Sequence, residues 1–138
     1  MSAYARWLFG IAAAANLLVA ASMSVGQRLF VAALALDPMS GTNVILVDLA
    51  ALLIATFGYG YARIALDPRR LRPLIGIGAI GKLAAVALVL FGAIADPRLW
   101  RLFALISGDV LFAGLFLDYL RRTADSSLSG EQKISLDS

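Results

Sequence analysis

Four long apolar segments constrain the fold of this chain more than any other feature. They cover residues 7–25, 44–66, 74–95 and 99–120, and each approaches or exceeds the roughly 20 residues that a helix needs to cross a bilayer core. Of all 138 residues, 61% are hydrophobic and 15% are charged, whereas soluble domains carry about 25% charged residues. The mean hydropathy is +0.85. The sequence therefore predicts an all-α protein, a transmembrane four-helix bundle in a lipid bilayer.

Residues 1–122 are expected to form this single domain. Residues 123–138 are polar and are expected to form a disordered cytoplasmic tail. The apolar stretch 29–36 in the first loop is too short to span a membrane, so an interfacial helix is favoured over a lid across a cavity. A cleaved signal peptide is the alternative interpretation of the first segment, but the apolar run there is long enough to span.

The arginines predict an orientation, because positive residues close to membrane ends favour the cytoplasm. Seven would share one side in a four-span topology, and these are Arg6, Arg63, Arg69, Arg70, Arg72, Arg121 and Arg122. The other side would hold Arg28, Arg98 and Arg101. We therefore expect a multi-pass protein of a bacterial inner membrane with both termini in the cytoplasm. Membrane topology also explains the net charge of +3, so no nucleic-acid partner is expected.

Three polar residues inside the apolar segments are predicted to meet at one depth. A rise of about 1.5 Å per residue places Lys82 roughly 12 Å, Asn16 roughly 14 Å and Asp109 roughly 16 Å from the cytoplasmic end. A lone charge at mid-membrane costs at least about 2.5–3.5 kcal/mol. Lys82 and Asp109 are therefore expected to face the bundle interior and to form an ion pair or share a proton. Asn16 is expected to hydrogen-bond beside them.

A fourth polar residue, Asp48, lies closer to the outer end of its helix and shares a helical face with Tyr59. The candidate ligand-binding residues are Lys82, Asp109, Asp48, Asn16 and Tyr59. In this hypothesis Lys82 contacts an anionic group of the ligand and the aspartates balance its charge. The alternative is purely structural, because a buried ion pair also fixes helix register and partner choice.

An internal repeat is a further hypothesis. Residues 8–17 align with residues 74–83, which sets Asn16 opposite Lys82, and residues 47–52 align with 108–113, which sets Asp48 opposite Asp109. Parallel repeats of this kind occur in transporters. The bundle would then consist of two repeated helical hairpins.

Several kinds of chemistry are disfavoured by residues that the sequence lacks. It contains no cysteine and no histidine, which removes disulfides, thiol redox chemistry and imidazole-ligated haem or zinc. Gly76, Gly81 and Lys82 match part of a phosphate-binding loop, but Leu83 stands where that loop needs Ser or Thr to hold magnesium. No catalytic residue, cofactor or metal is therefore expected, and the sequence favours a protein that is not an enzyme.

The second half of the chain carries a resemblance to a known group. A Pro68-Arg69-Arg70 loop leads into a glycine-rich third segment with Gly-Lys-Leu at 81–83, and the fourth segment has Gly-Asp at 108–109 with Phe112 and Phe116. This layout resembles the small four-helix membrane proteins of bacteria that are broadly DoxX-like. Members of that group have been linked to redox or sulfur metabolism as membrane accessory subunits, so the resemblance implies an accessory role. It assigns no role to any residue.

Three functions remain open at this point. The leading hypothesis is a homodimeric membrane protein that binds a small or amphipathic ligand at the Lys/Asp/Asn cluster, with proton-linked transport as its extension. The second is a structural or accessory subunit of a larger membrane complex. The third is a membrane enzyme acting on a lipid or quinone.

Overall fold

The computed structural model describes the backbone of residues 3–136 and the side chains of residues 3–124. Its elements are α1 (Ala3–Ser24), α2 (Gln27–Leu34), α3 (Thr42–Leu66), α4 (Arg72–Ala95), the 3₁₀ turn η1 (Pro97–Leu99), α5 (Trp100–Ile106) and α6 (Gly108–Leu136). Within the described residues, four helical segments are long and apolar enough to cross a membrane, namely α1, α3, α4 and the composite Pro97–Ala124. The predicted all-α bundle with four membrane-length helices is therefore confirmed.

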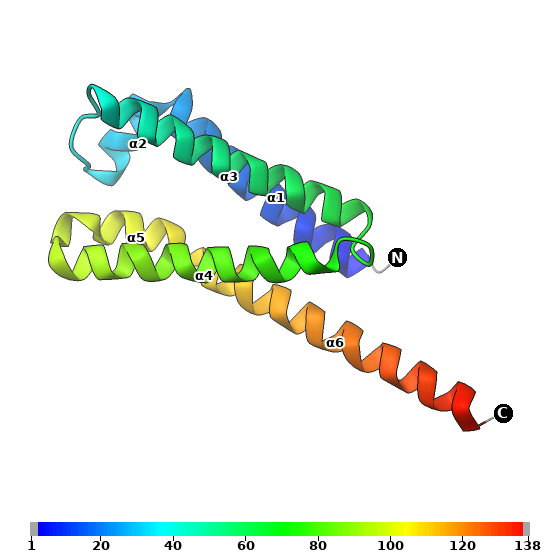
Figure 1. The fold of residues 1–138 in the computed structure, drawn as a ribbon. Coiled ribbons are helices and arrows are strands. Elements are labelled where there is room, and N and C mark those ends of the chain that lie inside the picture. Colours follow the sequence, from blue (N-terminus) through cyan, green and yellow to red (C-terminus); the bar gives the residue numbers. More distant parts are fainter. Residues whose placement is uncertain (1–2, 137–138) are drawn as a thin grey trace.

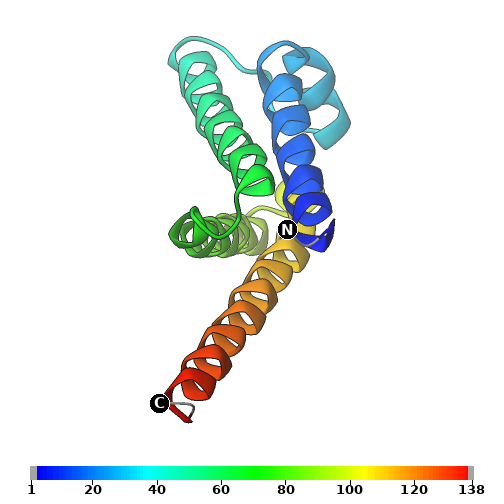
Figure 2. The same ribbon diagram turned by 90° about the vertical axis from the view of Figure 1, so that its right-hand side faces the viewer.

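The four spans pack as two pairs (Figure 1). Helix α1 runs along α3, and α4 runs along α5 and α6. The approach of α1 to α3 depends on Gly58, because a Cβ there would lie 3.0 Å from Cγ of Leu17 and 3.2 Å from Cβ of Asn16. Small residues allow this approach between membrane helices. Figure 2 shows that the two pairs are inclined to each other, with α4 seen nearly along its axis.

One end of the bundle, here named the closed end, holds the main core. Its buried residues are Ala5, Leu8, Phe9, Ala12, Ala13, Tyr61, Ile64, Ile75, Ala79, Ala113, Phe116 and Tyr119. The ring centroids of Phe9 and Phe116 lie 4.9 Å apart, and those of Tyr61 and Phe116 lie 5.1 Å apart. Such tilted and edge-to-face arrangements are favourable for aromatic pairs. All four spans contribute to this cluster, so it fixes the two pairs against each other.

At the opposite end, here named the open end, the two pairs diverge (Figure 1). Helices α2 and α5 lie there. Two long polar contacts bridge the pairs: Arg98 Nη1 lies 3.5 Å from Asp37 Oδ1, and Arg101 Nη1 donates to the Ala33 carbonyl at 3.5 Å. Exposed contacts of this kind contribute little to stability.

The fourth span is interrupted at Ser107, between the last residue of α5 and Gly108. The Ser107 hydroxyl donates to the carbonyl of Ala104 at 2.8 Å. Gly/Ser pairs are common sites of helix kinks, and serine hydroxyls satisfy backbone groups where a membrane helix is broken. The break places Asp109 in the first turn of α6, where the helix dipole favours a negative charge.

The expectation that residues 123–138 form a disordered cytoplasmic tail stays a prediction, and residues 137–138 lie outside the described residues. Helix α6 continues beyond the fourth span to Leu136. No proline follows Pro97 in the sequence, and extending an existing helix requires no new nucleation. The fourth span starts at Asp96-Pro97, where Asp96 Oδ1 accepts a hydrogen bond from the backbone N–H of Arg98 at 2.9 Å. Aspartate is a favoured cap at helix starts, and proline suits the first helical position.

Candidate functional site

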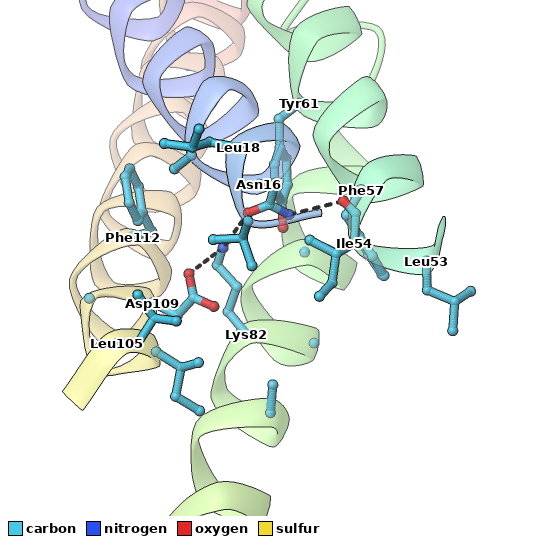
Figure 3. Close-up of a pocket in the computed structure, with 17 residues that line it drawn as sticks. Asn16, Leu18, Leu53, Ile54, Phe57, Tyr61, Lys82, Leu105, Asp109 and Phe112 are labelled. Carbon is cyan, nitrogen blue, oxygen red and sulfur yellow. Dashed lines mark hydrogen bonds and ion pairs between the residues drawn. The ribbon is translucent and has the colours of Figure 1, made fainter. Parts of the chain in front are cut away.

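An ion pair between α4 and α6 lies just beyond the core of the closed end (Figure 3). Lys82 Nζ lies 2.5 Å from Asp109 Oδ1. The same ammonium donates to Asn16 Oδ1 at 3.2 Å, and Lys82 is 6% exposed. The sequence predicted this pair and the amide beside it, and the structure confirms both. The three residues meet because all three helices are regular between the closed end and these residues.

Two aromatic rings complete the surroundings of the ammonium. Lys82 Nζ lies 5.4 Å from the ring centroid of Tyr61 and 5.4 Å from that of Phe112. Attraction between a cation and an aromatic face stabilises a charge that has left water. Gly78 leaves room for the Tyr61 ring, because a Cβ at Gly78 would lie 2.8 Å from Tyr61 Cε1 and 2.8 Å from its hydroxyl oxygen.

Asn16 connects the two helix pairs through its amide. Its oxygen accepts from Lys82 on α4, and its Nδ2 donates to the carbonyl of Ile54 on α3 at 3.4 Å. The amide orientation follows from this pattern, since only the oxygen can accept from an ammonium. Together with Asp109 on α6, these contacts join all four spans at one level.

A partly enclosed cavity of about 420 Å³ adjoins the ion pair, between the two helix pairs. Its walls are mainly apolar and come from Ala15, Asn16, Leu18, Val19, Leu53, Ile54, Phe57, Tyr61, Gly78, Gly81, Lys82, Ala85, Leu105, Ile106, Gly108, Asp109 and Phe112. Lys82 and Asp109 are the two charged residues among them. Their accessibility differs, because the Asp109 side chain is 30% exposed and the Lys82 side chain 5%. The carboxylate is therefore the more accessible member of the pair.

The structure does not bring Asp48 and Tyr59 to this cluster. Asp48 is exposed and does not line the cavity. Tyr59 is 61% exposed, and its hydroxyl accepts a hydrogen bond from Arg63 at 3.3 Å. The expectation that both join Lys82 in one site is corrected here. At about 100° per residue, the two share a face of α3 that is turned well away from the one carrying Phe57 and Tyr61.

Tyr61 is the site residue that the sequence analysis missed. It lies on the same face of α3 as Ile54 and Phe57, at spacings of seven and four residues. That i, i+3, i+7 pattern was a usable signal, because it marks one helical stripe. Tyr59 lies only two residues before Tyr61 but points to a different side of α3.

The set of side chains limits what the site can do chemically. Lys82 is a cation, and Asp109 is its single carboxylate partner. One carboxylate beside an ammonium does not provide the several oxygen or nitrogen ligands that metals require. Within the side chains that the structure describes, no three acidic, histidine or cysteine residues gather at one place. The arrangement is suited to hydrogen bonding and to apolar contact.

Comparison with models of protein families, with characterised proteins and with solved structures gives no match. The cavity and its ion pair are therefore the features of this protein that bear on its function.

Proposed function

We propose that this membrane protein binds a small amphipathic molecule in the cavity beside Lys82 and Asp109. The observation that carries the proposal is the combination of a cavity of about 420 Å³ with a polar group in its wall that remains accessible, Asp109 at 30% exposure. Ligand pockets are typically about 300–1,000 Å³, mainly apolar, with a few polar groups that orient the ligand. The ligand head would meet Asp109, Asn16 and Lys82, and its apolar part would contact Leu53 and Phe57.

Native mass spectrometry from a mild detergent tests this proposal. Gly81 lines the cavity, and a Cβ there would lie 3.8 Å from Phe57 Cζ, so Gly81→Leu adds a side chain to the cavity wall while Lys82 and Asp109 keep their identity. Gly114→Leu is the matched control, because a Cβ at Gly114 meets nothing within 4 Å. We expect a bound molecule on the wild type and on Gly114→Leu, and at least about fivefold less of it on Gly81→Leu. Equal retention by all three proteins would contradict the proposal.

The membrane and orientation are part of the same proposal. The N-terminal end of α1, the α3–α4 connection and the C-terminal half of α6 lie at one end of the bundle (Figure 1), and this end carries the seven arginines. We propose that it faces the cytoplasm of a bacterial inner membrane. The chain has no native cysteine, so single introduced cysteines report cleanly. A membrane-impermeant thiol reagent added outside should label Ser40→Cys and leave Arg70→Cys unlabelled, and the reverse pattern would invert the orientation.

A second candidate function, an accessory subunit, is favoured by the outer face of α3. Asp48 is exposed there beside Leu49 and Leu52, which are 52% and 62% exposed. A carboxylate among lipid-facing side chains is costly, and a second copy or a larger partner would cover it. Such a role would agree with the DoxX-like resemblance. Loss of a native complex on Asp48→Leu, with cavity binding retained, would favour this function.

A further inference from the structure

The charges in the wall of the cavity cancel, which restricts the ligand that the proposed function would accommodate. Lys82 contributes the positive charge and Asp109 the negative one, and the other lining residues are uncharged. A ligand with a net charge would leave that charge uncompensated within the apolar part of the membrane, where a lone charge is costly. A neutral head group adds no such cost.

Hydrogen-bonding capacity remains unused beside the pair. An ammonium has three donors and a carboxylate has two acceptor oxygens. Lys82 uses two donors on Asp109 and Asn16. Among the side chains that the structure describes, Asp109 Oδ2 accepts no hydrogen bond and the Tyr61 hydroxyl makes none. Polar groups in apolar surroundings usually find partners, so a bound head group that both donates and accepts would satisfy them.

We propose that the cavity binds a neutral amphipathic alcohol. Its hydroxyl group donates to Asp109 Oδ2 and accepts from Tyr61 or from the third N–H of Lys82. Asp109 is the accessible partner, with 30% of its side chain exposed against 5% for Lys82, so the ligand meets an acceptor first. This inference rests on the proposed function and narrows it, and it replaces the expected contact between Lys82 and an anionic group.

The apolar part of the ligand follows from the remaining walls. Ile54 and Phe57 line the cavity beside Asn16, and Leu53 lies farther out (Figure 3). Leu18 lines the cavity as well. Leu18 is 71% exposed and Leu53 56% exposed. In a bilayer these side chains contact acyl chains, so an alkyl chain longer than the cavity continues past them into the lipid. A long-chain alcohol therefore fits without a larger cavity.

Photo-crosslinking with three matched probes tests the head group. The probes share one diazirine-bearing alkyl chain and end in a hydroxyl, a sulfate or a trimethylammonium group, of which the last two are permanently charged. The full-length protein is reconstituted in phosphatidylcholine vesicles, and crosslinked residues are mapped by mass spectrometry. We expect the alcohol to label cavity-lining residues at least about tenfold more than either charged probe, given the cost of a lone intramembrane charge.

Two variants should reverse the selectivity. Asp109→Asn leaves the Lys82 charge unbalanced, so the alkyl sulfate should become the preferred probe. Lys82→Met leaves the Asp109 charge unbalanced, so the trimethylammonium probe should gain. Gly114→Leu lies outside the cavity and should keep the wild-type order. If either charge variant does not fold, the order of the three probes on the wild type still decides the inference.

The two proposals fail differently in this experiment. Preferential labelling of the wild-type cavity by the sulfate or the trimethylammonium probe would overturn the neutral head group and leave ligand binding intact. If none of the probes labelled a cavity-lining residue above the level on Gly81→Leu, the proposed binding function would fall as well.

Discussion

The closed and open ends of the bundle belong to the same four spans but are packed with different side chains. At the closed end, Phe9, Ile64 and Phe116 are 0% exposed. At the open end, the buried side chains are mostly small, as with Ala20, Ala51 and Ala93. Helices in lipid are held together by packing and hydrogen bonds, because lipid tails are as apolar as leucine. The contrast indicates that the closed end supplies most of the stability, and that the looser packing beyond it leaves the cavity.

The largest expected effect is the loss of an aromatic ring from the closed end. Phe116→Ala removes contacts to Phe9 and Tyr61 and should lower the free energy of unfolding by about 3 kcal/mol. This value is at the lower end of the range for buried phenylalanines, because a phenylalanine of the unfolded protein in a membrane is surrounded by lipid and not by water. Phe91→Ala is the control, since Phe91 is 73% exposed. Steric trapping in bicelles measures both. Equal losses of stability for Phe116→Ala and Phe91→Ala would contradict the conclusion that the closed end supplies most of the stability.

The second effect concerns the ion pair at the boundary of the two ends. Asp109→Leu leaves the buried Lys82 without its countercharge and should cost roughly 2–3 kcal/mol. The double variant with Lys82→Met should recover at least about 1 kcal/mol, because neither charge then remains. The same unfolding measurement on both single variants and the double variant completes the cycle. Strictly additive losses would show that the two residues are not energetically coupled.

The third effect compares two glycines one turn apart on α4. Gly78→Ala places a methyl group against the Tyr61 ring, which is 1% exposed and has little room to move, so we expect a loss of about 1–2 kcal/mol. Gly81→Ala meets its nearest neighbour at 3.8 Å and should be neutral or slightly stabilising. Thermal unfolding in detergent compares the two. A larger loss of stability for Gly81→Ala than for Gly78→Ala would contradict the assignment of the tighter packing to Gly78 and Tyr61.

The smallest effect is expected at the open end. Arg98→Ala removes the exposed contact to Asp37 and should change stability by less than about 0.5 kcal/mol. The cap of the fourth span is retained, because Asp96 accepts from the backbone N–H of residue 98. A loss near that of Phe116→Ala would show that this contact, and not the aromatic core, holds the two pairs together.

The sequence predicted the parts of this structure that depend on one helix at a time. The spans follow from the length and composition of the apolar segments, and each observed boundary lies within four residues of the predicted one. The meeting of Lys82, Asp109 and Asn16 followed from depth along regular helices together with the cost of an unpaired charge. Both arguments use properties that are local to a span.

What depends on how spans face one another was not predictable in the same way. Asp48 and Tyr59 share a face of α3, but the sequence does not say which face turns toward α4, and the structure turns the face with Tyr61 there. The cavity follows from the inclination between the two helix pairs, which no residue encodes alone. The internal repeat stays a hypothesis, and the two halves differ in that Asp109 is inside the bundle and Asp48 is on its surface.

The mutual neutralisation of Lys82 and Asp109 also has an electrical consequence. A membrane potential acts on net charge with about 2.3 kcal/mol per elementary charge per 100 mV. Lys82 Nζ and Asp109 Oδ1 lie 2.5 Å apart, so the potential exerts nearly equal and opposite forces on the two charges. While both residues are ionised, the membrane potential therefore has almost no net effect on the ion pair. Uptake or release of an uncharged molecule there would be electroneutral, so an energised and a de-energised membrane would favour the occupied state equally.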